Sequence, residues 1–139
     1  MRFRLTFEER IVLRYLQEEE QAATSIDVAN RTGLDHHQVR EVFSSLAEKD
    51  LIIAEDRTAG ELSLFGRNYN LFDDESIDTL YDGLQPETRI LLDHFIQDPD
   101  ATPSREVLKA VDGLKAEEIE SAIDELEHLG YPAGKRVQS

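Results

Sequence analysis

The sequence predicts a mainly α-helical protein made of two tandem three-helix units, the first of which ends in a small β-hairpin. Two observations carry this prediction. Amphipathic segments recur in the same order twice, and the first set is followed by a short stretch with the alternating pattern of strands. We expect unit 1 over residues 1–70, a connecting helix over 71–84, and unit 2 over 85–139 with a reduced hairpin.

The repeat is visible as a direct alignment of the chain with itself. Residues 8–32 align with 87–111 at an offset of 79, and after a one-residue insertion residues 33–51 align with 113–131 at an offset of 80. The identical positions include Leu13 with Leu92, Ser25 with Ser104, Val28 with Val107, Gly33 with Gly113 and Leu46 with Leu126. Self-similarity of this kind predicts one architecture used twice.

The helices of unit 1 follow from capping residues and from the 3.6-residue period. Thr6 and Glu9 have the spacing of a capping box, which predicts a helix over about 6–20. Thr24 opens a second helix over 25–32, and Gly33 ends it because glycine tolerates the left-handed conformation. Asp35 caps a third helix over 36–49, whose apolar face consists of Val39, Val42, Phe43 and Leu46.

The segment that follows the third helix predicts the β-hairpin, over residues 51–65. Leu51-Ile-Ile and Glu61-Leu-Ser-Leu-Phe are apolar stretches with partial alternation, and the residues between them include Asp56 and Gly60, which are typical of turns. Residues 66–70 are expected to form a loop. The second unit has only a short segment after its third helix, so its hairpin is expected to be small or missing.

Three stretches of unit 1 resemble the winged-helix superfamily, which includes the multiple-antibiotic-resistance and arsenical-resistance repressors. They are Ser25-Ile-Asp-Val-Ala-Asn-Arg-Thr-Gly-Leu34, Val39-Arg-Glu-Val-Phe-Ser-Ser-Leu46 and Lys49-Asp-Leu-Ile-Ile53. The resemblance covers most of residues 1–65 and, less closely, residues 85–131. It implies two tandem winged-helix, or helix-turn-helix, units with a small β-hairpin wing. Since that fold also serves RNA-binding and protein-docking modules, function has to be argued from exposed residues.

The resemblance implies that the third helix of unit 1 enters the major groove of duplex DNA while the wing contacts a neighbouring groove or phosphate. Gln and Arg side chains can pair with base edges through two hydrogen bonds, and basic side chains contact phosphates. The candidate DNA-binding residues are His36, His37, Gln38, Arg40, Ser44, Lys49, Arg57 and Arg67. We therefore expect a DNA-binding transcriptional regulator that reads duplex DNA through unit 1.

Unit 2 offers a different surface, which supports an alternative function. Six of the nine outward positions on its third helix are acidic, namely Glu117, Glu118, Glu120, Asp124, Glu125 and Glu127. Carboxylates repel phosphates, so this helix is expected to face solvent, a basic protein partner, or a second copy of the chain in a homodimer. The alternative is an acidic adaptor for protein–protein interaction in a chromosome or transcription complex.

Composition limits the remaining classes. The net charge is −15, with nine bases and thirteen acids in residues 1–70 against six bases and seventeen acids in 71–139. An acidic chain with eleven Arg and four Lys fits adaptation to high salt, but it also fits many proteins from ordinary environments. The absence of a long apolar run and of an apolar leader predicts a cytoplasmic protein without a membrane span.

The sequence contains no motif that predicts an enzyme, a cofactor site or a metal site. There is no cysteine, no glycine-rich phosphate loop and no nucleophile motif. His36 and His37 are adjacent, so on a helix their side chains point about 100° apart and do not converge on one metal ion. We expect a non-enzymatic chain that binds no cofactor and no metal.

Overall fold

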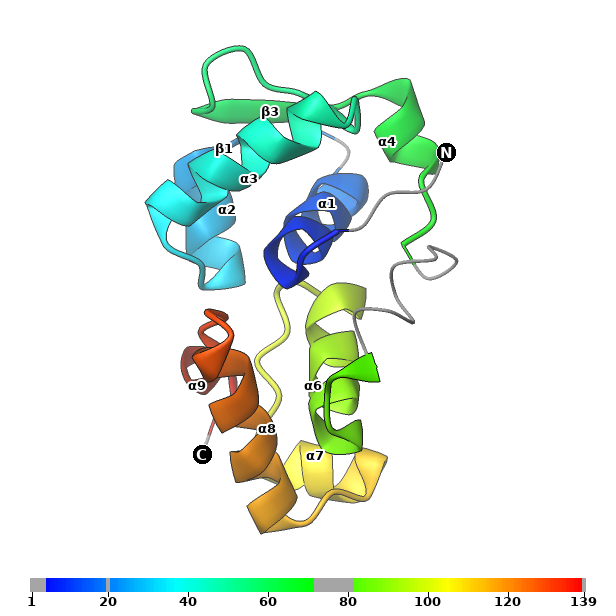
Figure 1. Cartoon of the computed structure of the whole chain (residues 1–139), viewed down its shortest axis with the longest axis vertical. Coiled ribbons are helices and arrows are strands. Elements are labelled where there is room, and N and C mark those ends of the chain that lie inside the picture. Colours follow the sequence, from blue (N-terminus) through cyan, green and yellow to red (C-terminus); the bar gives the residue numbers. More distant parts are fainter. Residues whose placement is uncertain (1–4, 20, 72–81, 139) are drawn as a thin grey trace.

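The computed structural model describes residues 5–19, 21–71 and 82–138, which form two helical units stacked along the long axis of the molecule (Figure 1). Unit 1 contains α1 (Phe7–Glu19), β1 (Ala23–Thr24), α2 (Ser25–Thr32), α3 (His36–Glu48), β2 (Ile52–Ile53), β3 (Ala59–Leu62) and α4 (Leu64–Asn68). Unit 2 contains α6 (Pro86–Gln97), α7 (Arg105–Asp112), α8 (Ala116–His128) and α9 (Ala133–Arg136). Residues 72–81, and so most of the predicted connecting helix, lie outside the described residues.

The helices of unit 1 begin and end where their caps predict. Thr6 and Glu9 form the capping box, with each side chain accepting a hydrogen bond from the other residue's amide at 3.2 and 3.1 Å. Asp35 caps α3 by accepting from the amide of His37 at 2.8 Å. Gly33 ends α2 with a φ of 79°, the left-handed conformation that favours glycine. The three predicted helices are therefore confirmed to within two residues.

A small antiparallel sheet lies beside these helices, with strand order β1-β3-β2. Ile52 pairs with Leu62 and Ala23 pairs with Gly60, and these four residues face the core. Gly60 packs closely there, because a Cβ atom would lie 3.2 Å from Ile52 Cδ1 and 3.5 Å from the ring of Phe43. The other face of the sheet is exposed to solvent.

The predicted hairpin over 51–65 is correct in kind but too long. Its strands end at Leu62, and the loop expected over 66–70 is largely replaced by the short helix α4. Ser63 starts this helix by accepting a hydrogen bond from the amide of Gly66 at 2.9 Å. At Gly66 the helix touches the preceding chain so closely that a Cβ atom would lie 1.8 Å from the carbonyl oxygen of Leu51. Glycine at this position therefore permits the turn away from the sheet.

Unit 2 repeats the three helices but not the hairpin. Its last described helix is α9, and Gln138, just after that helix, forms a parallel bridge with Ser104. Ser104 is the N-cap of α7, the role that Thr24 has in α2, and the buried Leu108 matches the buried Val28. The extra residue of unit 2 thus lies before α7 and not at its end, so the pairings of Ser25 with Ser104 and of Val28 with Val107 were wrong.

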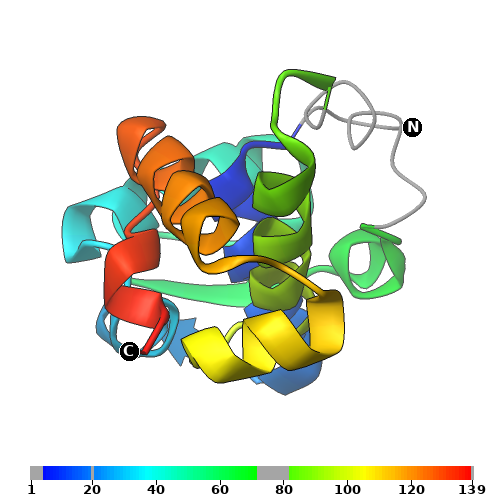
Figure 2. The same ribbon diagram turned by 90° about the horizontal axis from the view of Figure 1, so that it is seen from below.

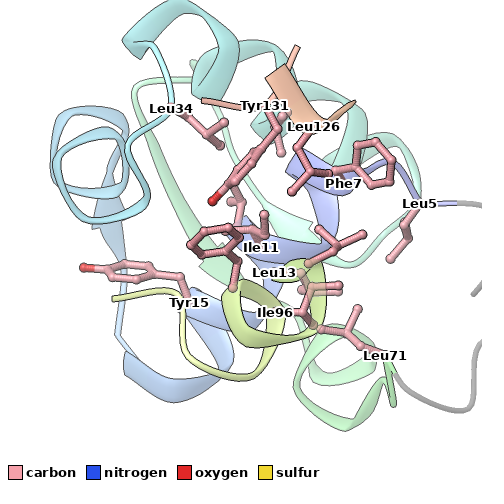
Figure 3. Close-up of a cluster of buried hydrophobic side chains, with 14 of the residues drawn as sticks. Leu5, Phe7, Ile11, Leu13, Tyr15, Leu34, Leu71, Ile96, Leu126 and Tyr131 are labelled. Carbon is pink, nitrogen blue, oxygen red and sulfur yellow. The ribbon is translucent and has the colours of Figure 1, made fainter. Parts of the chain in front are cut away.

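The two units share one apolar core. Figure 3 shows Ile11 and Leu13 of α1 close to Ile96 of α6, with Leu126 and Tyr131 of unit 2 beside them. All five are nearly or completely buried in a single cluster. Viewed from below, the helices of unit 2 cover one end of unit 1 (Figure 2). The repeat therefore folds as one body in which the first helices of both units lie against each other.

Candidate interaction surfaces

The α3 helix, which carries most of the predicted DNA contacts, packs one face on the core and turns the other outward. Val39, Phe43 and Leu46 are completely buried. On the outward side of this helix His37, Glu41 and Glu48 are exposed, while Arg40 and Ser44 are half-buried. The sequence prediction of which face is outward is thus confirmed.

Three of the eight predicted DNA contacts are engaged within the protein. The Nε2 atom of His36 lies 2.8 Å from Ser25 Oγ, so this ring is fixed against the start of α2. Gln38 completes the α3 capping box, because its Oε1 atom accepts a hydrogen bond from the amide of Asp35 at 3.0 Å. These two contacts hold the side chains of His36 and Gln38 against the starts of α2 and α3.

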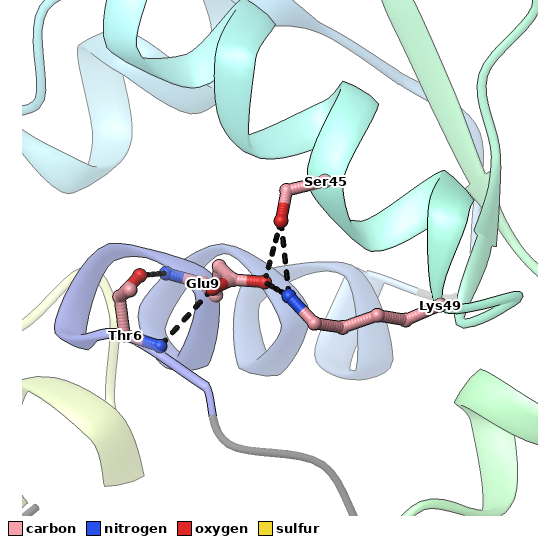
Figure 4. Close-up of polar contacts among 4 residues, drawn as sticks. All are labelled: Thr6, Glu9, Ser45 and Lys49. Atoms are coloured by element: carbon pink, nitrogen blue, oxygen red, sulfur yellow. Dashed lines mark hydrogen bonds and ion pairs between the residues drawn. The ribbon is translucent and has the colours of Figure 1, made fainter.

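Lys49 is the third engaged residue, and its contacts explain why the end of α3 is held to α1. Its Nζ atom donates to Glu9 Oε2 at 2.6 Å and to Ser45 Oγ at 3.0 Å (Figure 4). The side chain of Glu9 is only 5% exposed and also accepts hydrogen bonds from the Thr6 amide and Ser45 Oγ, and Lys49 supplies the positive charge that balances this buried carboxylate. Sequence reasoning missed this role because Glu9 and Lys49 are far apart in the chain.

The other predicted contacts remain accessible but do not form a basic surface. Arg57 is exposed in the loop between β2 and β3, where its φ of 66° is left-handed. Arg67 is exposed on α4. Asp56 precedes Arg57 in this loop, and its pKa is lowered by hydrogen bonds from the side chain and amide of Thr58 and, to a smaller extent, by the charge of Arg40. Asp56 therefore stays ionised and offsets part of the positive charge near the loop.

Acidic side chains are also exposed on the elements expected to contact DNA. Glu41 and Glu48 on α3, together with Glu55, Asp56 and Glu61 around the β2–β3 loop, are all exposed. A hollow of about 230 Å³ lies between α1 and α3. Its lining includes three acids, Glu8, Glu9 and Glu41, together with Thr6, Gln38, Val42 and Ser45. Within the described part of unit 1, α3 and the β2–β3 hairpin therefore expose more acids than bases.

On α8 of unit 2, several of the predicted outward acids have structural partners. Glu120 forms an ion pair with Arg105 of α7. Glu125 accepts from the amide of Gln85 at 3.1 Å, and Glu127 accepts from the amide of Gly134 at 3.0 Å. The acidic face thus also holds α8 to the start of α6 and to α9.

The units meet at a cleft of about 520 Å³ and at a buried arginine that the sequence did not single out. Arg136 of α9 is 5% exposed and donates to the carbonyl oxygens of Arg31 in α2, Pro99 and Ala101, the last at 2.9 Å. Its guanidinium carbon lies 5.5 Å from the centre of the Phe95 ring. The cleft is lined by Ala29, Asn30, Gly33, Leu34, Asp35, His36, Gln38, Glu127, Gly130, Tyr131, Pro132 and Lys135.

Within residues 5–19, 21–71 and 82–138, no cluster of three or more His, Asp or Glu side chains is arranged to hold a metal ion. No helix in those ranges has the length and apolar character to cross a membrane. No family model, curated protein or solved structure matches this chain.

Proposed function

We propose that this chain is a protein-interaction module that docks a positively charged partner protein, with two tandem winged-helix units as its scaffold. The order helix, strand, helix, helix, strand, strand in unit 1 supports the winged-helix assignment for that unit. The matching order of α6, α7 and α8 supports a related, wingless unit 2.

One observation carries the choice of partner: the elements of unit 1 expected to meet DNA expose five acids, while three of the expected contact side chains are hydrogen-bonded within the protein. Duplex DNA presents one negative charge about every 1.7 Å along its axis. A carboxylate about 8 Å from a phosphate costs about 0.5 kcal/mol even in a water-like dielectric. Several such pairs would cancel the attraction from Arg40, Arg57 and Arg67, whereas the same surface attracts a basic protein.

The first experiment measures whether the chain binds nucleic acid at all. Fluorescence anisotropy of a labelled random-sequence duplex would be followed as salt is raised from roughly 50 to 500 mM. We expect no measurable affinity at any salt concentration. Affinity purification from the source cells, with and without nuclease, should then recover one dominant protein in both samples, and the purified protein should rebind the purified chain. Recovery that depends on intact nucleic acid would overturn the proposal.

DNA binding is the second candidate function, and the exposed loop favours it. Arg57 lies in the position of a wing, and His37, Arg40 and Ser44 are the parts of the outward α3 face not used by the helix caps. This function predicts an affinity that falls with salt and is lost in Arg57→Ala. The matched control is Arg105→Ala on unit 2, which removes the same charge from a surface not expected to touch DNA.

A further inference from the structure

The exposed face of the sheet in unit 1 contains a groove that the proposed function does not yet use. Along β3 the residues alternate, so that Gly60 and Leu62 face the core while Ala59 and Glu61 face solvent. Ile53, which pairs with Glu61, is on the same outer face and is 57% exposed. The groove has a volume of about 320 Å³ and is lined by Ala22, Ile53, Glu55, Asp56, Thr58, Ala59, Gly60 and Glu61. We call it the sheet groove.

The lining of the sheet groove combines an apolar floor with an acidic rim. Ile53 and Ala59 provide apolar surface, and every charged residue of the lining is an acid: Glu55, Asp56 and Glu61. Asp56 is held in place because it accepts from the amide and the hydroxyl of Thr58 at 3.0 and 2.6 Å. The rim therefore presents negative charge next to an apolar surface, and part of that charge is fixed in position.

Ile53 is not explained by the folding of the sheet. The neighbouring Ile52 is 3% exposed and fills the core position of β2, so the core does not need the second isoleucine. An apolar residue in solvent is ordinary when it is isolated, but this one lies in a groove surrounded by three acids. In addition, within the described residues β2 has a strand on one side only, which leaves a sheet edge beside the groove.

We propose that the sheet groove binds an extended, lysine- or arginine-rich segment of a partner protein that inserts one apolar side chain against Ile53. The inference rests on the proposed function, since it names the surface and the kind of segment through which the partner docks. The volume suits one or two side chains, the rim complements basic residues on either side, and the β2 edge offers backbone groups to an extended chain. Three carboxylates exclude a nucleic-acid strand from the same place.

The test uses a fluorescein-labelled synthetic peptide in which lysine alternates with leucine, and an analogue with glutamate in place of lysine. Binding to the full chain is measured by anisotropy at low salt, and the site is mapped from backbone amide shifts in NMR spectra. Ile53→Thr removes the apolar anchor but keeps a β-branched residue that suits a strand. Its matched control is Val111→Thr, which makes the same kind of change at a valine that is 71% exposed on α7.

Charge is tested separately with two double variants of equal net charge. Glu55→Gln with Glu61→Gln neutralises the rim, while Glu106→Gln with Glu117→Gln neutralises two exposed acids of unit 2. We expect the rim variant and Ile53→Thr each to weaken binding of the lysine peptide roughly tenfold, and the controls to change it less than about twofold. The largest amide shifts should be those of Ile53, Ala59 and Glu61, and the glutamate peptide should not bind.

The outcomes distinguish failure of the proposed groove from failure of the proposed protein-interaction function. If the lysine peptide binds but Ile53→Thr and Val111→Thr behave alike, the groove is wrong and the partner docks on another acidic surface. If the peptide does not bind and duplex DNA does, both the groove and the protein-interaction function are wrong. Thermal unfolding of each variant is recorded, and because Ile53 is largely exposed we expect its replacement to leave the melting temperature within a few degrees of wild type.

Discussion

Replacing Arg136 by methionine tests whether a buried guanidinium holds the two units together. Methionine keeps most of the apolar stem beside Phe95 but leaves the carbonyl groups of Arg31, Pro99 and Ala101 without their donor. The carbonyl of Arg31 is in the last turn of α2, where helix carbonyls have no partner within the helix and where the helix dipole favours a cation.

The expected loss of stability follows from the balance of two terms. Three hydrogen bonds from a charged donor contribute about 1.5–3 kcal/mol each, and returning the guanidinium to water recovers several kcal/mol of desolvation energy. We expect Arg136→Met to lower the free energy of unfolding by about 3–4 kcal/mol, which is a large share of the roughly 5–15 kcal/mol typical of a folded domain. The melting temperature should fall by roughly 10–15 °C.

The assay is urea unfolding followed by circular dichroism, with Lys135→Met as the control. Lys135 is the preceding residue on the same short helix but is exposed, so its replacement should change the free energy of unfolding by less than about 0.5 kcal/mol. Equal effects of the two substitutions, or an Arg136→Met variant as stable as wild type, would refute the role assigned to the guanidinium.

Three further predictions concern other contacts. Gly113→Ala should cost about 1 kcal/mol because φ is 70° and the space around it is open, whereas Gly33→Ala, at φ 79° and with an arginine Cδ atom 2.8 Å from the new Cβ, should cost about twice as much in urea unfolding. Lys49→Met should lower the free energy of unfolding by about 2 kcal/mol because Glu9 stays buried, and an unchanged value would show that the pair is dispensable. Burial raises the pKa of Tyr131 above its usual 10.0, because the buried site favours the neutral phenol. The contribution of the neutral Tyr131 to the free energy of unfolding is therefore complete below pH 10 and is lost as the pH rises further. Absorbance and circular dichroism should therefore change together in an alkaline titration, and full ionisation of all tyrosines in the folded chain would contradict this.

Local signals in the sequence predicted the elements of unit 1 well because each is fixed by residues close in the chain. The capping box of Thr6 and Glu9, the N-cap Asp35 and the left-handed Gly33 all act within one helical turn. By contrast, the helix at Leu64–Asn68 depends on the close approach of Gly66 to Leu51, which no local pattern reveals.

The candidate DNA-binding residues illustrate the limit of the same reasoning. Which face of α3 is outward could be predicted from its apolar stripe, but which outward side chains are accessible could not. Lys49 and Glu9 are separated by 40 positions, and His36 and Ser25 by 11, so their contacts depend on how α1, α2 and α3 pack. The sequence nevertheless contained one indication of the Glu9–Lys49 contact. Glu9 belongs to a capping box next to a buried apolar stripe, and a carboxylate buried there needs a cation from elsewhere in the chain.

The same interior contacts make the surface more negative than the composition alone suggests. Arg10 is completely buried and donates to the carbonyl oxygen of Leu71 at 3.1 Å, and Arg136 is buried among three carbonyl groups. Both cations thus donate to backbone carbonyl groups inside the protein. Since the chain has 30 acids and only 15 bases, a base held among carbonyl groups inside the protein, as Arg136 is, leaves the outer surface with a larger excess of acid. A basic partner that covers part of this surface would relieve the repulsion among its carboxylates, and this gain should shrink as salt screens it.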